Sequence, residues 1–292
     1  MSKTLEQAPP NQREMLIIAA GLTVVCLVAA MILGGLYFIT QPAKEHNVQL
    51  REQSMIRGLL DLTPQAKILE VRRYLRSEGR DLQVIYLTTK SLVTMDLNGN
   101  ELATHVVPDD IATSNSSEMK DDWVFKQIKA PSAGQIKYAG RFFVGVEGTR
   151  RAGYVVEGIT AGYKNWIRFF MAIDSAYGIR GVEIIEHEED PGLGAEITQR
   201  YFKNQFAGRS LADIERITVT KDPLPDDWLK ALETLGDMPF QPWLEKYRAM
   251  LPKNPNIHAI TGSTISSAAV TNGVKRALAN FRKRMNLVEK YL

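Results

Sequence analysis

The sequence has almost no cysteine: of its 292 residues only Cys26 is one, and it lies inside an apolar run. A single cysteine excludes an intrachain disulfide, a zinc site made of four cysteines and an iron–sulfur centre ligated by this chain alone. A strong excess of one charge is also missing, because 36 basic residues stand against 33 acidic ones and the net charge is +3. We therefore expect no nucleic-acid binding. No repeat of about 20 to 50 residues occurs, which argues against a solenoid or propeller.

Long apolar runs are scarce as well, since only residues 15–39 form one, with 25 successive uncharged residues. As a helix this run would measure about 37 Å, enough to cross a hydrocarbon core of roughly 30 Å. A cleaved signal peptide is the alternative, but its apolar region is usually about 7 to 15 residues long. We predict a tail over residues 1–14 and an uncleaved anchor in the lipid bilayer over 15–39. Basic residues on both sides leave the orientation open.

Residues 43–140 are predicted to form a membrane-proximal helix and a small β-rich region. A helix over Glu45–Leu62 should stop near Pro64. Alternating apolar residues then predict a small antiparallel meander, with strands at Leu82–Leu87, Leu92–Leu97 and Glu101–Val107. The polar stretch Pro108–Asp122 has the composition of an exposed loop or a boundary between modules.

Residues 141–292 are predicted to form the main domain. Strand signals occur at Phe142–Val146, Tyr154–Ile159, Ile167–Ile173 and Gly181–Ile185. Helices are expected at Glu196–Phe206, Asp226–Leu235 and Pro242–Met250, and the last one begins just after Thr264. This mixture favours an α+β fold over a doubly wound sheet.

The start of the last helix carries a run of hydroxyl residues, Thr261-Gly262-Ser263-Thr264-Ile265-Ser266-Ser267. Helix N-termini present unpaired amides and the positive end of the helix dipole, so a phosphate can bind there. Gly262 would allow the backbone to approach closely, and the hydroxyls could donate to phosphate oxygens. The alternative is that these residues only cap the helix.

This segment resembles the flavinylation motif of FMN-binding domains, Asp-x-x-Ser/Thr-Gly-Ala-Ser/Thr. In that family a separate flavin transferase joins the phosphate of FMN to the last hydroxyl, which corresponds to Thr264. A second block, 181–194, is similar to the family's segment ending in His-x-Glu-Thr-Pro-Gly-Leu-Gly. The two blocks occur in the family's order, and the resemblance covers roughly residues 140 to 290.

Together with the anchor, these blocks resemble the G subunits of Rnf-type ion-translocating electron-transport complexes. The homologous C subunits of the sodium-pumping NADH:quinone oxidoreductase share the same features. The resemblance implies one membrane helix in the bacterial inner membrane and a periplasmic C-terminal domain. It also implies other complex subunits and a flavin transferase as partners.

Three positions depart from the family's pattern. Asp190 stands where Thr is usual and Ser263 where Ala is usual, and both sites should tolerate the change. His258 replaces the usual Asp six residues before Thr264, a carboxylate that the transferase could recognise. The structural alternative for His258 is a surface imidazole at a strand end, which we favour over a catalytic role.

The cofactor-binding candidates lie in two segments. They are Thr264, as the attachment site, and Thr261, Gly262, Ser263, Ile265, Ser266, Glu189, Pro191, Gly192, Leu193 and Gly194. We assign no catalytic residue and no metal site, because the acidic cluster around His187 has the character of a solvated turn. Trp166, Phe169 and Phe170 are possible neighbours of the flavin ring, although core packing is the more ordinary use for such residues. Lys275, Arg276 and Arg282 are expected to face water.

The leading functional hypothesis is an electron-carrier subunit whose FMN relays electrons within an ion-translocating membrane complex. A flavin-free scaffold or sensor with the same fold is the alternative, motivated by His258. A membrane-bound flavin reductase is a third, weaker possibility. The sequence leaves open which of the two complexes is involved, which ion is coupled and what potential the flavin has.

Overall fold

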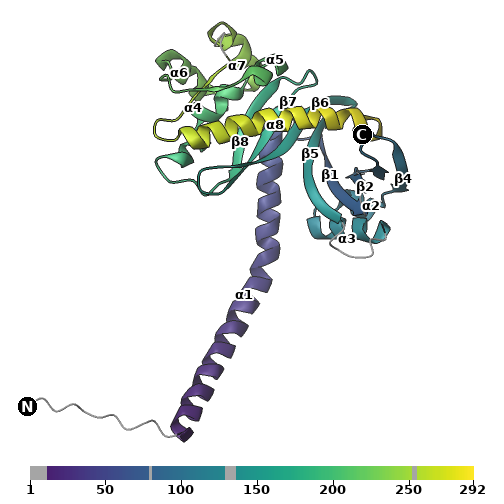
Figure 1. Cartoon of the computed structure of the whole chain (residues 1–292), viewed down its shortest axis with the longest axis vertical. Helices are drawn as coiled ribbons and strands as arrows, with labels where there is room; N and C mark the ends of the chain where they lie inside the picture. The colour runs from purple at the N-terminus through teal and green to yellow at the C-terminus, as the bar shows by residue number, and fades with distance from the viewer. Residues whose placement is uncertain (1–11, 79–80, 129–135, 252–254) are drawn as a thin grey trace, which may run out of the picture. The chain divides into compact units, whose positions relative to one another are not determined.

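The computed structural model describes residues 12–78, 81–128, 136–251 and 255–292 (Figure 1). The chain divides into two compact units, Met1–Glu52 and Gln53–Leu292. One helix, α1 (Gln12–Leu60), contributes residues to both units. All described residues of the first unit belong to α1, and all the strands lie in the second unit.

In the first unit, α1 is long and apolar enough to cross a membrane, and its apolar stretch is fully exposed. Its exposed apolar side chains include Leu16, Ile18, Leu33 and Phe38. Exposure of so many apolar side chains to water is unfavourable, whereas contact with lipid is favourable. The predicted anchor over 15–39 therefore lies within a helix. We expected a separate helix from Glu45, but α1 is continuous up to Leu60.

The second unit is built on an eight-stranded antiparallel sheet in the order β4-β3-β2-β1-β5-β6-β7-β8. Its strands are β1 (Lys67–Glu78), β2 (Asp81–Leu87), β3 (Ser91–Met95), β4 (Glu101–Val106), β5 (Ile136–Glu147), β6 (Arg150–Ala161), β7 (Trp166–Ile173) and β8 (Ile179–Glu186). The predicted division at residue 140 falls inside β5, so both predicted parts contribute strands to one sheet.

Short helices and a small second sheet complete this unit. The helices are α2 (Asp109–Thr113), α3 (Ser117–Gln127), α4 (Arg200–Lys203), α5 (Leu211–Arg216), α6 (Asp226–Thr234) and α7 (Phe240–Tyr247). The 3-10 turns are η2 (Gly194–Thr198), η3 (Asn204–Phe206), η4 (Arg248–Met250) and η5 (Glu289–Tyr291). The strands β9 (Val219–Thr220) and β10 (Ile257–His258) pair in parallel, and the long helix α8 (Thr264–Val288) follows them.

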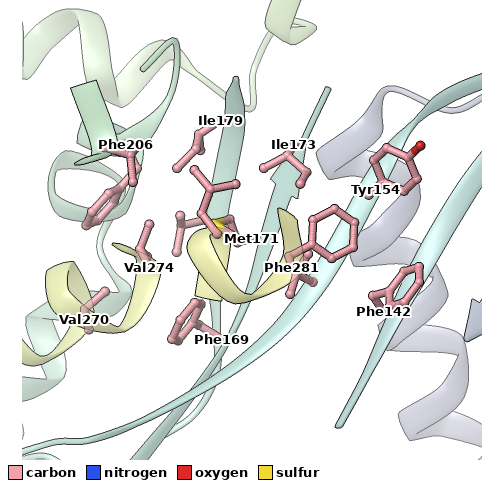
Figure 2. Packing of buried hydrophobic residues seen from close by; sticks show 14 of the residues in the cluster. Phe142, Tyr154, Phe169, Met171, Ile173, Ile179, Phe206, Val270, Val274 and Phe281 are labelled. Atoms are coloured by element: carbon pink, nitrogen blue, oxygen red, sulfur yellow. The ribbon is translucent and has the colours of Figure 1, made fainter. Parts of the chain in front are cut away.

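Helix α8 crosses one face of the large sheet, which we call the α8 face (Figure 1). Its buried positions recur every three or four residues, from Val270 through Val274, Leu278 and Phe281. Phe281 meets the rings of Phe142 and Tyr154 at centroid distances of 5.1 and 5.3 Å (Figure 2). This core fixes α8 on the sheet, and so it fixes the place where the helix begins.

The opposite face of the sheet carries two smaller apolar clusters and a band of buried charges. One cluster includes Ile56 and Leu60 of α1, and the other includes Val124 of α3. In the band, Glu70 accepts a hydrogen bond from Lys120 at 2.7 Å, and Glu157 accepts one from Arg141 at 2.7 Å. Burial alone would raise the pKa of each carboxyl, but the cations around it outweigh burial and hold the pKa below 4.5.

These two carboxylates predict an acid-sensitive fold. A carboxyl whose pKa is depressed in the folded state stabilises that state above its unfolded pKa and loses this contribution as the pH falls through its folded pKa. We expect the free energy of unfolding to fall as the pH drops below 4.5. Urea unfolding between pH 7 and pH 3 should give a shallower pH slope in the double variant Glu70→Gln, Glu157→Gln. An unchanged slope would contradict this role, and the exposed Glu188→Gln provides the control.

Several predicted elements need correction. The stretch Pro108–Asp122 is not an exposed loop, because it contains α2 and the start of α3, where the Ser116 hydroxyl accepts from the Met119 amide. The expected helix Glu196–Phe206 is broken into η2, α4 and η3. Strand β1 was not predicted, because its charged residues interrupt the alternation of apolar and polar residues. One of these charged residues, Arg72, is buried and pairs with Asp121. The other predicted strands were confirmed, although β5 begins at Ile136, six residues before the predicted start.

Candidate functional site

The hydroxyl-rich segment lies where β10 leads into α8. The side chain of Ser263, the residue before the helix, makes no capping hydrogen bond. Ser267 stabilises the turn instead: its hydroxyl accepts from the Ile260 amide at 3.1 Å and donates to the Ser263 carbonyl at 2.9 Å. The Ser263 hydroxyl therefore does not cap the helix.

Thr264 is the first residue of α8 and is partly exposed. Its hydroxyl has no hydrogen-bond partner among the residues that the structure describes. The amides of the first helical turn have no acceptors further back in the helix, so they can bind an anion. Gly262 adopts φ +78°, a left-handed conformation that glycine reaches without strain, and it brings bare backbone to the surface beside Thr264.

The loop Pro191–Gly194, which holds four of the predicted cofactor-binding residues, lies against this segment. A Cβ atom on Gly262 would lie 3.1 Å from Cδ2 of Leu193. Leu193 is 48% exposed, and Ile265, on the first turn of α8, is 58% exposed. Two apolar side chains are therefore available to a flat apolar ligand near the helix start.

Glu189 connects three segments beneath this surface. Its side chain is buried and accepts hydrogen bonds from the Tyr163 amide at 2.9 Å and from the Lys164 amide at 3.1 Å. The hydroxyl of Ser266, also buried, donates to the second carboxylate oxygen. Gly194 packs on this pair so closely that a Cβ atom there would lie 2.7 Å from the Glu189 carboxylate. Glu189 and Ser266 thus join the hairpin after β6, the Pro191–Gly194 loop and α8.

Substitution of Gly262 and of Gly192 should separate two effects on stability, that of backbone strain and that of the contact with Leu193. We expect Gly262→Ala to destabilise the chain by about 1–2 kcal/mol, because alanine is strained at this φ and its methyl group presses on Leu193. Gly192→Ala is the matched control, since φ is +72° there and a Cβ atom meets nothing within 4 Å. Urea unfolding of both variants tests this, and a cost for Gly262→Ala no larger than the control's would refute the loop contact.

The remaining candidates from the sequence differ in burial and in their contacts. Phe169 and Phe170 are fully buried, so core packing explains them, whereas Trp166 is 59% exposed. Arg276 donates to the hydroxyl of Thr160 at 2.9 Å, and Arg282 pairs with Glu215. These contacts engage both guanidinium groups with other residues, and neither contact involves Thr264.

His258 occupies a strand end, as predicted, and is partly buried. Its Nδ1 lies 2.9 Å from the Asp222 carbonyl, and its amide donates to the Gln205 side chain at 2.8 Å. These contacts give the residue a structural role in holding β10.

Two kinds of group support the site without having been predicted from the sequence. The amides of Tyr163 and Lys164 hold Glu189 through backbone groups, which no side-chain pattern reveals. Ser267 belongs to the hydroxyl run, but its function in the turn depends on where β10 brings Ile260. The signal for a buried Glu189 was the pair of glycines, Gly162 and Gly194, that leave room for its carboxylate.

The site fits an FMN phosphate. It offers an unbonded hydroxyl on Thr264, free helix amides, a glycine without a side chain and two exposed apolar groups for the ring. The buried acid beneath the helix start, Glu189, is engaged by two amides and a hydroxyl, so its charge is compensated.

Several relatives of this chain belong to ion-translocating redox complexes. The G subunit of the proton-translocating ferredoxin:NAD(+) oxidoreductase complex of Clostridium ljungdahlii is 24% identical over 69% of this chain and 94% of its own length. The G subunit of the Na(+)-translocating complex of Acetobacterium woodii is 26% identical over 66% of this chain and 79% of its own. Among solved structures, NqrC of Shewanella oneidensis covers 83% of this chain and 99% of its own, with 12% identity and a TM-score of 0.45. Residues 162–279 match the family model of the FMN-binding domain.

Proposed function

We propose that this chain is an electron-carrier subunit of a membrane-bound, ion-translocating oxidoreductase complex. FMN, once bound, supplies the redox chemistry by accepting and donating electrons. The chain itself holds and orients the flavin, and it needs other subunits to deliver and remove the electrons.

The single observation that carries this proposal is the free hydroxyl of Thr264 at the start of α8. Thr264 would hold the FMN phosphate as an ester, and Gly262 and the first amides of α8 would bind the phosphate oxygens. Leu193 and Ile265 would contact the flavin ring. Ser266 and Glu189 are buried and hydrogen-bonded to each other, and we propose that they position the start of α8 for the cofactor.

The relatives support the redox context. Two of them are named as G subunits of ferredoxin:NAD(+) oxidoreductase complexes, one translocating protons and the other Na(+). We further propose that α1 anchors the chain in the inner membrane through residues 15–39, that the C-terminal domain faces the periplasm, and that a flavin transferase attaches the FMN.

The test is the activity of membranes that lack only this chain. Ferredoxin-dependent reduction of NAD(+) should be lost when the gene is removed and restored when the full-length chain is returned. Full activity without the chain, in membranes where the other subunits are assembled, would contradict an electron-carrying role.

A flavin-free scaffold is the second candidate, and His258 favours it, because histidine stands where the family's motif has Asp. The two roles predict different results for the same preparation. A scaffold would be colourless and would still be required for assembly of the complex, whereas an electron carrier would be yellow.

A further inference from the structure

Three successive acids lie beside the candidate flavin site, and the tip of the hairpin between β6 and β7 binds each of them. Asn165 donates from its side-chain amide to Glu188 at 2.8 Å, and two backbone amides of the tip donate to Glu189. The ammonium group of Lys164 forms an ion pair with the carboxylate of Asp190. The acids that the sequence presents as a solvated turn are therefore held by the hairpin.

The same acidic segment lies against the start of α8. The backbone carbonyl of Asp190 accepts a hydrogen bond from the amide of Leu193 at 3.2 Å, and a Cβ atom on Gly262 would lie 3.1 Å from Leu193. The adjacent Glu189 accepts from the hydroxyl of Ser266, which belongs to the first turn of α8. Two separate contacts thus bring the acids next to the end of α8 that would bind the phosphate.

A phosphate at the start of α8 would therefore lie close to negative charge. The carboxylate of Glu189 is engaged by two amides and a hydroxyl, whereas the partly exposed carboxylate of Asp190 pairs with Lys164. Among the residues that the structure describes, no other cation pairs with the three acids. The hydrogen bond and the charge of Asp190 raise the pKa of Lys164, and the charge of Glu189 adds to this effect, so the ammonium group is charged at neutral pH.

We propose that Lys164 neutralises Asp190 and thereby lets the start of α8 accept an anionic phosphate. This inference rests on the proposed function, because the phosphate is that of FMN on Thr264. A phosphate that joins Thr264 to the flavin keeps one negative charge, and a carboxylate without its cation would repel it. Lys164 acts through Asp190, so it is a positioning residue.

Urea unfolding of the full chain in detergent tests this role, with and without the flavin. The two forms come from cells with and without an active flavin transferase. We expect Lys164→Gln to raise the equilibrium constant for unfolding roughly fivefold more in the flavin-carrying chain than in the bare chain, because only the former places a phosphate near an unpaired Asp190. Lys283→Gln is the matched control, since this exposed charge lies about 28 Å along α8 from Thr264, and it should affect both forms equally.

A second substitution separates the charge of the ion pair from a purely mechanical role. The double variant Lys164→Gln, Asp190→Asn removes the repulsion while the ion pair is still missing, so the ratio of the two unfolding constants should return to that of the unsubstituted chain. If Lys164→Gln takes up no flavin, uptake restored in the double variant supports the inference equally.

Three results would overturn the inference. These are equal destabilisation of the flavin-carrying and bare forms by Lys164→Gln, a double variant that does not recover the ratio, and flavin uptake that stays absent in the double variant. Each of them leaves the proposed function intact, because the unsubstituted chain carries its flavin. An unsubstituted chain that never takes up flavin would instead contradict the proposed function, and this inference with it.

Discussion

Thr264→Ala should abolish attachment of FMN to the chain. The substitution removes the hydroxyl that we propose carries the phosphoester, while the methyl group that remains preserves the helix start. We expect a colourless protein, no flavin fluorescence in a denaturing gel, and electron flow through the complex reduced at least about a hundredfold, because flavin is the redox group.

Two control variants show whether the effect belongs to this hydroxyl. Thr264→Ser keeps a hydroxyl at the same place and should retain the flavin. Thr261→Ala removes an exposed neighbouring hydroxyl and should also retain it. A Thr264→Ala protein that still carries covalent flavin, or that supports normal electron flow while colourless, would refute the attachment site.

Glu189→Ala should cause the largest loss of stability at the site. Removal of the carboxylate leaves two backbone amides and the hydroxyl of Ser266 without their acceptor, all in a buried place. Bonds to charged groups contribute about 1.5–3 kcal/mol each and their losses are not additive, so we expect a total cost of roughly 3–5 kcal/mol. Urea unfolding of the full chain measures this cost.

The variant should also carry less flavin, since Ser266 and the Pro191–Gly194 loop would no longer fix the start of α8. Glu188→Ala is the matched control: this neighbouring carboxylate is exposed and accepts only from the Asn165 side chain, at 2.8 Å. Its cost should stay within about 0.5 kcal/mol. Equal costs for the two variants would show that Glu189 does not join the three segments.

Much of the sheet could be predicted from sequence, because alternation of apolar residues reports which face is buried. Strands β5 to β8 follow this rule, with Phe142, Tyr154, Met171 and Val182 all on the α8 face. Strand β1 breaks it, since the buried Arg72 and the half-buried Glu70 form ion pairs with residues of α3 and β5. Pairing across distant segments cannot be deduced from the local pattern of one strand.

The residues of the candidate site could be predicted from the sequence, but the hydrogen bonds that join them could not. The hydroxyl run and the glycine loop could be named because short motifs carry their own chemistry. That Glu189 is buried beneath them depends on backbone amides of the hairpin at Tyr163. Such contacts are set by the tertiary fold and leave no trace in composition or spacing.

The most direct measurement is the mass of the peptide that contains Thr264, from full-length chain produced together with an active flavin transferase. We predict that this peptide carries one FMN, that fragmentation places it on Thr264, and that the protein is yellow. A bare Thr264 peptide from a colourless protein, with a transferase that modifies a known acceptor in the same cells, would contradict the proposed function.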